Sequence, residues 1–210
     1  MPLRVVLADD HPIVREGLRA LLETGGIDVV GEAGDGREAV RLAHLLQPDV
    51  VVLDLFMPLL NGLEAAIDIF RVRPDSAVLL LTISREPHHL VAARRAGIGG
   101  YVLKTDAAQE LIEAIQRVSS GETYVSGALT TAPDLPPDPL TRRERQVLQL
   151  IAEGRNTKEI AALLGFSFKT AESYRLDIMT KLNTHRTAGL VRYAVRRGLI
   201  QAAAAWCALL

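Results

Sequence analysis

Charged and polar side chains follow short apolar runs at several points in the first half of this 210-residue sequence. Three carboxylates brought together would repel one another, and a hard divalent cation such as Mg2+ is the natural compensation. A lysine and a threonine nearby would supply a charge and a hydroxyl for the oxygens of a phosphoryl group. The residues concerned are Asp9, Asp10, Asp54, Thr82 and Lys104.

The elements that would position these residues are parallel strands joined by crossover helices. Apolar runs such as VVVLD and AVLLLT are too hydrophobic for any place but a sheet covered on both faces. We expect strands at residues 4–8, 28–32, 50–53, 77–82 and 100–103, and helices near 12–23, 36–46, 63–72, 87–96 and 107–119. Because the carboxyl ends of parallel strands meet at one edge, the five polar residues are predicted to lie together there.

Some of these residues also have a purely structural explanation. Asp10 could cap the helix that opens at Pro12, and Lys104 could simply be solvated at a strand end. The joint placement of all five residues at strand ends favours a site for a cation and a phosphoryl group.

A proline-rich segment separates this region from a second domain. Four prolines between residues 133 and 139 indicate an extended linker, which we place at 121–139. Thr141 and Glu144 then form the pattern of a capping box, and helices are expected near 141–153, 157–164, 168–182 and 187–198. The predicted organisation is a first domain at 1–120, an all-helical domain at 140–200 and an apolar tail at 201–210.

The second domain has the pattern of a helix-turn-helix. Asn156 to Glu159 gives another capping box, Gly165 fits a left-handed helix end, and Ser167 can cap the following helix. Helix hairpins with glycine turns also occur in proteins that do not bind DNA. Charge favours a polyanionic partner, because residues 140–210 carry 12 basic and 5 acidic side chains, whereas residues 1–120 carry 12 and 17.

The motifs Asp54-Leu-Phe-Met-Pro, Asn61-Gly62 and Tyr101-Val-Leu-Lys104 closely resemble the receiver domain of two-component response regulators, over residues 3–120. The resemblance implies a five-stranded parallel sheet of order 2-1-3-4-5 flanked by five helices. It also implies that a histidine kinase transfers a phosphoryl group to Asp54.

Further roles follow from the same resemblance. Mg2+ would be held by Asp9, Asp10, Asp54 and the Phe56 carbonyl. Lys104 and Thr82 would contact the phosphate, while Thr82 and Tyr101 would form the conformational switch. Ordinary explanations for this last pair, a strand-end hydroxyl and a half-buried aromatic ring, stay open.

The stretch from Leu140 to Ile200 closely resembles the LuxR-type effector domain of NarL/FixJ response regulators. By this resemblance, residues 168–182 form the recognition helix, with Lys169, Glu172, Ser173 and Leu176 toward the bases. Phosphate or sugar contacts are expected from Lys158, Thr170, Tyr174 and Arg175. A solvated helix face is the alternative for any one of them. The final helix would form the dimer contact, although packing on the first helix of the domain explains its pattern equally well.

These features predict a DNA-binding response regulator in which phosphorylation of Asp54 switches homodimerisation and DNA binding, with RNA polymerase as a further candidate partner. A phosphatase of the haloacid dehalogenase type would need a second aspartate where Phe56 stands, so an enzyme is not expected. A phosphorylation-independent regulator remains the other alternative.

The rest of the sequence excludes several classes of protein. The single cysteine, Cys207, rules out an internal disulfide and a cluster of thiolate ligands. The N-terminus reaches charged residues before a signal peptide could form, and no run of 18 apolar residues occurs. A cytoplasmic protein without a membrane segment is therefore expected.

Overall fold

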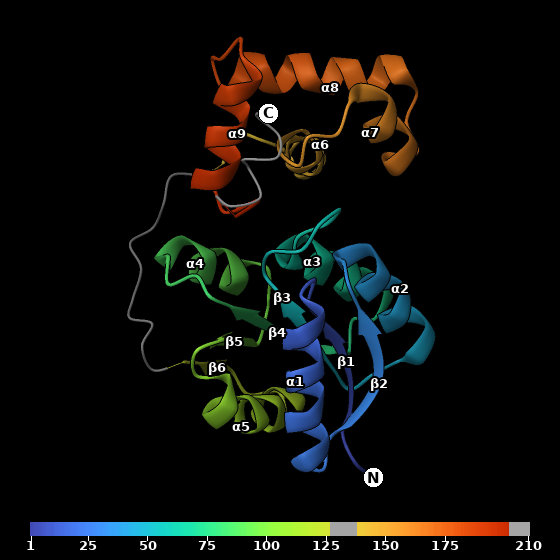
Figure 1. Cartoon of the computed structure of the whole chain (residues 1–210), viewed down its shortest axis with the longest axis vertical. Coiled ribbons are helices and arrows are strands. Elements are labelled where there is room, and N and C mark those ends of the chain that lie inside the picture. Colours follow the sequence, from blue (N-terminus) through green and yellow to red (C-terminus); the bar gives the residue numbers. More distant parts are fainter. Residues whose placement is uncertain (127–137, 202–210) are drawn as a thin grey trace. The chain divides into compact units, whose positions relative to one another are not determined.

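The computed structural model describes residues 1–126 and 138–201 (Figure 1). The chain divides into two compact units, Met1–Leu135 and Pro136–Leu210. The tail expected at 201–210 lies outside the described residues, apart from Gln201. None of the helices in the described ranges combines the length and the apolarity that crossing a membrane requires.

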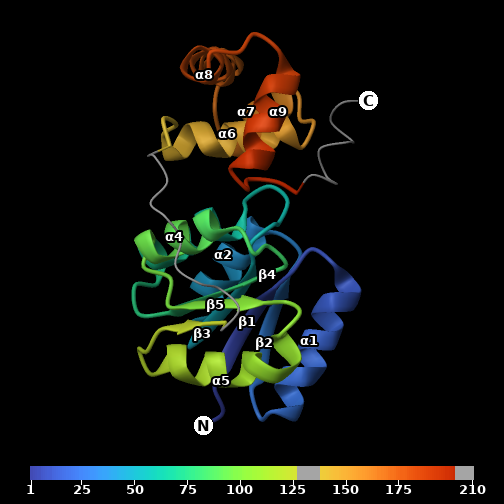
Figure 2. The same ribbon diagram turned by 90° about the vertical axis from the view of Figure 1, so that its left-hand side faces the viewer.

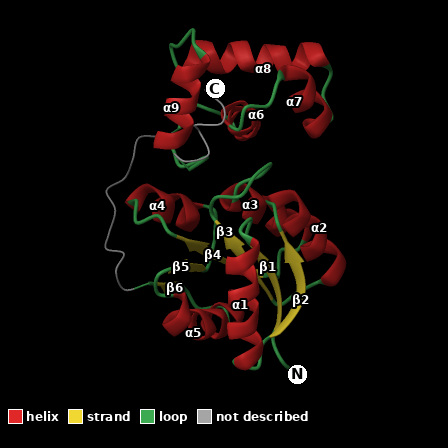
Figure 3. Cartoon of the chain, viewed as in Figure 1, coloured by secondary structure: helices red, strands yellow, loops and turns green. Residues whose placement is uncertain are grey.

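The first unit is built on a parallel sheet, shown in yellow in Figure 3. Its strands are β1 (Arg4–Ala8), β2 (Asp28–Ala33), β3 (Val50–Asp54), β4 (Ala77–Thr82), β5 (Gly100–Leu103) and β6 (Tyr124–Val125). They lie in the order β2-β1-β3-β4-β5-β6, and every neighbouring pair is parallel. The α/β fold predicted from the sequence is confirmed, and so is the order of its first five strands.

The sixth strand corrects the expected count of five. Tyr124 and Val125 pair with Gly100 and Tyr101 of β5, within a segment that the sequence placed in the linker. A strand of two residues is too short to show alternation of polar and apolar side chains, so periodicity could not reveal it. Because this strand follows the helix at Ala107–Ser119 in the chain and pairs with β5, the first unit extends beyond its last helix.

Helices cover both faces of the sheet. They are α1 (Pro12–Thr24), α2 (Gly36–Leu46), α3 (Gly62–Val72), α4 (Pro87–Arg95) and α5 (Ala107–Ser119). Figure 2 shows α4 and α5 on opposite sides of the sheet. Side chains of α1 and α5 pack with Val5, Leu7, Val50 and Val52 in one core. Side chains of α2, α3 and α4 pack with Val6, Ala8, Val51 and Leu53 in the other. Successive strand residues point to opposite faces, which explains why these strands are apolar at every position.

The second unit contains α6 (Arg142–Ala152), α7 (Thr157–Leu164), α8 (Phe168–Lys181) and α9 (Thr187–Arg196). Both predicted capping boxes are present, at the starts of α6 and α7. Lys181 at the end of α8 also binds Glu144 of the first box, with 2.8 Å between Nζ and Oε2. The expected all-helical fold is confirmed, with helix ends shifted by one or two residues.

Asp138 is joined to this second unit by its side chain. Its Oδ1 accepts hydrogen bonds from the Tyr193 hydroxyl at 2.8 Å and from the Leu140 amide at 2.9 Å. Although the sequence placed Asp138 in the linker, its carboxylate fixes the approach of the chain to α6 and α9.

Candidate functional site

The ends of β1, β3, β4 and β5 bring the predicted polar residues together. Lys104, directly after β5, lies with its Nζ 2.6 Å from Asp9 Oδ2 and 2.8 Å from Asp54 Oδ2. Asp9 follows β1 and Asp54 ends β3, so the ammonium joins two strands that are not consecutive in the sequence. Side chains 50 residues apart in the chain, Asp54 and Lys104, meet as the strand-end argument required.

Burial makes this cluster electrostatically strained. The Asp9 side chain is fully buried and that of Asp54 is 1% exposed. Burial raises the pKa of Asp54 to about 6, although Lys104 opposes the rise. Burial lowers the pKa of Lys104, but its ion pairs with Asp54 and Asp9 outweigh burial, and the net pKa is raised. A buried site with excess negative charge is suited to a cation.

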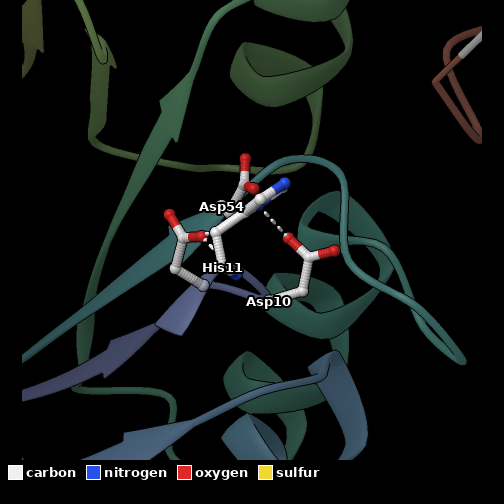
Figure 4. A group of neighbouring side chains, drawn as sticks. Asp10, His11 and Asp54 are labelled. Carbon is white, nitrogen blue, oxygen red and sulfur yellow. Dashed lines mark hydrogen bonds and ion pairs between the residues drawn. The ribbon is translucent and has the colours of Figure 1, made fainter. Parts of the chain in front are cut away.

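Asp10 and His11 complete the acidic side of the site (Figure 4). One ligand atom from each of Asp9, Asp10, His11 and Asp54 lies within 4.8 Å of the other three. The helix cap of α1 is His11, so Asp10 lies one residue before the capping position that the structural alternative gave it. Three carboxylate oxygens so close together fit Mg2+, a hard cation that prefers oxygen ligands and completes its shell with waters and phosphate oxygens.

Phe56 stands two residues after the phosphoacceptor candidate. Its amide donates a hydrogen bond of 3.3 Å to Asp54 Oδ1, so the backbone of this loop is turned toward the site.

The Asn61-Gly62 motif, which follows in the sequence, packs closely against the backbone of Asp54. A Cβ at Gly62 would lie 2.2 Å from the Asp54 carbonyl oxygen, and Asn61 caps α3 by accepting from Glu64 N. Asn61-Gly62 therefore serves the loop that holds Asp54 in place.

Thr82 and Tyr101 converge on Ser84. Thr82 is fully buried, and its hydroxyl oxygen accepts from the Ser84 amide at 3.0 Å. Tyr101 is 2% exposed, and its hydroxyl donates to the Ser84 carbonyl at 3.4 Å. Burial raises the pKa of Tyr101, so its hydroxyl keeps its proton. Both side chains of the predicted switch thus bind the backbone of the same residue, Ser84, in the β4–α4 loop.

Two residues at the site were not anticipated from the sequence. Arg15 on α1 donates to the Asp9 carbonyl at 2.7 Å and pairs with Glu32, with 3.1 Å between Nε and Oε2. No motif signals such a contact, because it depends on how α1 lies over β2. The sequence could have indicated His11, because its imidazole is a possible metal ligand that directly follows two aspartates, which are also possible ligands.

In the second unit, α7 and α8 form a helix-turn-helix. Gly165 ends α7 at a φ of 69°, which favours glycine, and Ser167 caps α8 by accepting from Thr170 N at 3.1 Å. Ala171 and Ile178 bury one side of α8. The four side chains predicted to face bases are exposed: Lys169, Glu172, Ser173 and Leu176. The face of α8 that remains open is therefore the face that the resemblance assigned to DNA.

The side chains predicted to touch phosphates fall into two groups. Lys158 and Thr170 are exposed. Tyr174 stacks on Phe166 with ring centroids 5.3 Å apart, and Arg175 donates to the Thr187 hydroxyl at 2.7 Å. Tyr174 and Arg175 thus also have structural partners within the unit.

The final helix uses its apolar residues internally. Leu190, Val191 and Ala194 of α9 are buried within the second unit. Their pattern is thus explained by packing, and a dimer contact through α9 would have to use its remaining faces, which carry Arg192 and Arg196.

Two family matches account for both units. Residues 5–116 match the response regulator receiver domain, and residues 138–194 match the bacterial regulatory proteins of the luxR family. The chain therefore belongs to the NarL/FixJ family of response regulators, which join a receiver domain to a LuxR-type DNA-binding domain.

Individual relatives match along the whole chain. The transcriptional regulatory protein MctR of Rhizobium johnstonii is 38% identical over 205 residues, covering 94% of this chain and 95% of the relative. The response regulator UvrY of Escherichia coli is 37% identical over 211 residues, covering 95% and 97%. A structure of RcsB from Salmonella typhimurium is 31% identical, has a TM-score of 0.58, and covers 93% of this chain and 98% of its own.

The protein is thus a two-component response regulator that regulates transcription, and it is not an enzyme. Receiver domains bind Mg2+ at an acidic pocket of this kind, and response regulators pair with histidine kinases and bind DNA. A solved complex of RcsB with DNA, 31% identical with a TM-score of 0.58, covers 92% of this chain and 98% of its own.

Proposed function

We propose that Asp54 accepts a phosphoryl group from a histidine kinase, and that Asp9, Asp10, Asp54 and the Phe56 carbonyl hold Mg2+ for this reaction. The observation that carries the proposal is the position of Lys104, whose Nζ touches both Asp9 and Asp54. An ammonium held there neutralises charge on the transferred group, which is the main contribution a protein makes to phosphoryl transfer.

Each residue has a separate task in the transfer. An Asp54 carboxylate oxygen attacks the phosphorus in line with the P–N bond to the kinase histidine, which breaks as the O–P bond forms. The histidine leaves with the electron pair and takes up a proton, and Lys104 binds an equatorial oxygen of the transferred group. Bound Mg2+ would supply further positive charge to the phosphoryl oxygens. Thr82 donates its hydroxyl proton to another oxygen, and a rotation of its side chain toward that oxygen would weaken the bond that its oxygen accepts from the Ser84 amide. Such a rotation would loosen Ser84, whose carbonyl Tyr101 binds, and so pass the signal to the β4–α4 loop.

Asp54 is expected to be the sole phosphorylation site. Intact-mass measurement of the full chain after treatment with a small phosphodonor and Mg2+ should show one added phosphoryl group. The group should be absent from Asp54→Asn and present in Asp75→Asn, because Asp75 is exposed in the turn before β4, at the amino ends of the strands, whereas Lys104 lies at their carboxyl ends. Modification of Asp54→Asn to the wild-type extent would remove the assignment.

We further propose that residues 140–200 bind double-stranded DNA as a homodimer, with α8 in the major groove. The exposed side chains of α8 support this, together with the DNA complex reported for RcsB. Glu172 can accept from the amino group of cytosine, and Leu176 can contact the methyl group of thymine. Lys158 and Thr170 would touch phosphates. Dimerisation would follow phosphorylation or DNA binding, and RNA polymerase is a further partner consistent with transcriptional control.

A further inference from the structure

The His11 ring occupies a position that helix formation does not explain. His11 is the N-cap residue of α1, yet its side chain makes no capping hydrogen bond. Residues favoured at this position are Ser, Thr, Asp and Asn, whose side-chain oxygens accept from helix amides. The His11 ring turns instead toward the carboxylates, with Nδ1 2.7 Å from Asp10 Oδ1 and 3.4 Å from Asp9 Oδ1.

The spacing of the four side chains fits a single ion. Ligand atoms of Asp9, Asp10, His11 and Asp54 all lie within 4.8 Å of one another (Figure 4). In a tetrahedral site with bonds of about 2.0 to 2.2 Å, two ligand atoms lie about 3.3 to 3.6 Å apart. The widest pair of ligand atoms would have to close by roughly 1.3 Å, and the His11 side chain, which is 55% exposed, has room for this movement.

Charge and ligand type define the class of ion. Three carboxylates and the Lys104 ammonium sum to a formal charge of −2, which a divalent cation and a neutral imidazole bring to zero. Mg2+ prefers oxygen ligands, whereas imidazole is a good ligand for Zn2+ and neighbouring transition metals. Zn2+ is commonly bound by four ligands in a tetrahedron of nitrogen, sulfur and carboxylate oxygen atoms.

We propose that His11 gives the receiver site a second use, in which Asp9, Asp10, His11 and Asp54 bind Zn2+ and thereby block phosphorylation of Asp54. The blocking step rests on the proposed function of Asp54. A Zn2+ ion with four protein ligands has no open position for a phosphoryl oxygen. The Asp54 carboxylate that would attack phosphorus is itself one of those ligands.

The first test measures metal binding directly on the full-length protein. Zn2+ is titrated against a chromophoric chelator, and Co2+ serves as a spectroscopic substitute whose visible absorption reports tetrahedral coordination. Wild type should bind one Zn2+ at this site more tightly than Mg2+. His11→Asn should weaken Zn2+ binding by about tenfold or more, since even loss of an outer partner of a metal ligand costs 10–100-fold. His44→Asn, at an exposed position of α2, should bind Zn2+ like wild type.

The second test measures the block. Phosphorylation by a small phosphodonor at fixed Mg2+ is followed by intact mass while Zn2+ is raised, and each variant is compared with its own rate without Zn2+. Inhibition should need at least about tenfold more Zn2+ in His11→Asn than in wild type or His44→Asn. Equal Zn2+ affinity and an unchanged Co2+ spectrum in His11→Asn would overturn the proposal. Failure of wild type to be phosphorylated with Mg2+ alone would instead contradict the role of Asp54, and the binding titration would still decide the role of His11.

Discussion

At the scale of single residues, the most informative side chain is Lys104. The sequence predicted that it would meet Asp9 and Asp54, because parallel strands share one edge for their carboxyl ends. Contacts that depend on how a helix lies over the sheet, such as Arg15 on the Asp9 carbonyl, had no sequence pattern to reveal them. Residue types at strand ends were therefore predictable, whereas the side chains that hold their backbone were not.

A second residue, His89 on α4, should make the receiver unit sensitive to acid. Burial lowers its pKa to about 3, and its ring packs edge-on against Phe56 with centroids 5.5 Å apart. In the unfolded chain His89 binds a proton near pH 6.5, whereas in the folded chain it binds one only near pH 3. The free energy of unfolding is therefore highest above pH 6.5 and falls as the pH is lowered toward 3.

The contribution of His89 can be measured by urea unfolding of the receiver unit between pH 7 and pH 5. As the pH is lowered, the free energy of unfolding of the wild type should fall more steeply than that of His89→Gln. The difference in slope should approach about 1.4 kcal/mol per pH unit. An equal pH dependence of the free energy of unfolding in the two proteins would contradict the lowered pKa of His89.

At the scale of elements, the sequence located every helix of the described residues to within two positions, because amphipathic periodicity and caps mark helices strongly. It missed β6, whose two residues are held by β5 and not by any local pattern. Close approaches between elements also lay beyond periodicity. The contact of Gly62 with the Asp54 carbonyl is one such case, although the Asn-Gly motif marked its position.

Two glycine substitutions should therefore have opposite effects. Gly62→Ala should destabilise the receiver unit by about 1 to 3 kcal/mol and slow phosphorylation, because the new Cβ pushes on the backbone of Asp54. Gly17 is exposed on α1, and an added Cβ there would have no neighbour within 4 Å, so Gly17→Ala should instead stabilise the helix by about 0.5 to 1 kcal/mol. Thermal unfolding and phosphorylation rates measure both; similar losses in the two variants would contradict the steric argument.

At the scale of the whole molecule, the basic second unit should bind DNA largely through phosphates. Residues 140–210 carry 12 basic and 5 acidic side chains, a balance of +7. Each phosphate neutralised adds about 0.9 to the slope of log affinity against log salt, so we expect a steep titration. Lys158→Gln should reduce the slope by about 0.9 without changing the preferred sequence. A flat salt titration of the wild type would contradict binding through phosphates.

The acidic receiver is expected to restrain this binding until it is phosphorylated. A fragment from Pro139 onward should bind operator DNA without phosphorylation, while unphosphorylated full-length protein binds more weakly, as measured by gel shift at matched salt. A second fragment beginning at Asp138 keeps the bond to Tyr193 and controls for loss of stability. Equal binding by the fragments and by both forms of the full chain would show that the receiver is not an inhibitory gate.

The two ends of the connecting segment are each anchored by side chains. Ser126 is fully buried and its hydroxyl donates to Glu110 at 2.5 Å, while Asp138 is bound to Tyr193. The 12 residue steps between Ser126 and Asp138 can span at most about 43 Å, at 3.3 to 3.6 Å per residue. A short tether of this kind holds each unit at an effective concentration of roughly millimolar around the other. An encounter too weak to detect between separate fragments would then be substantially populated in the intact chain, and a change of about 1.4 kcal/mol on phosphorylation would shift it tenfold.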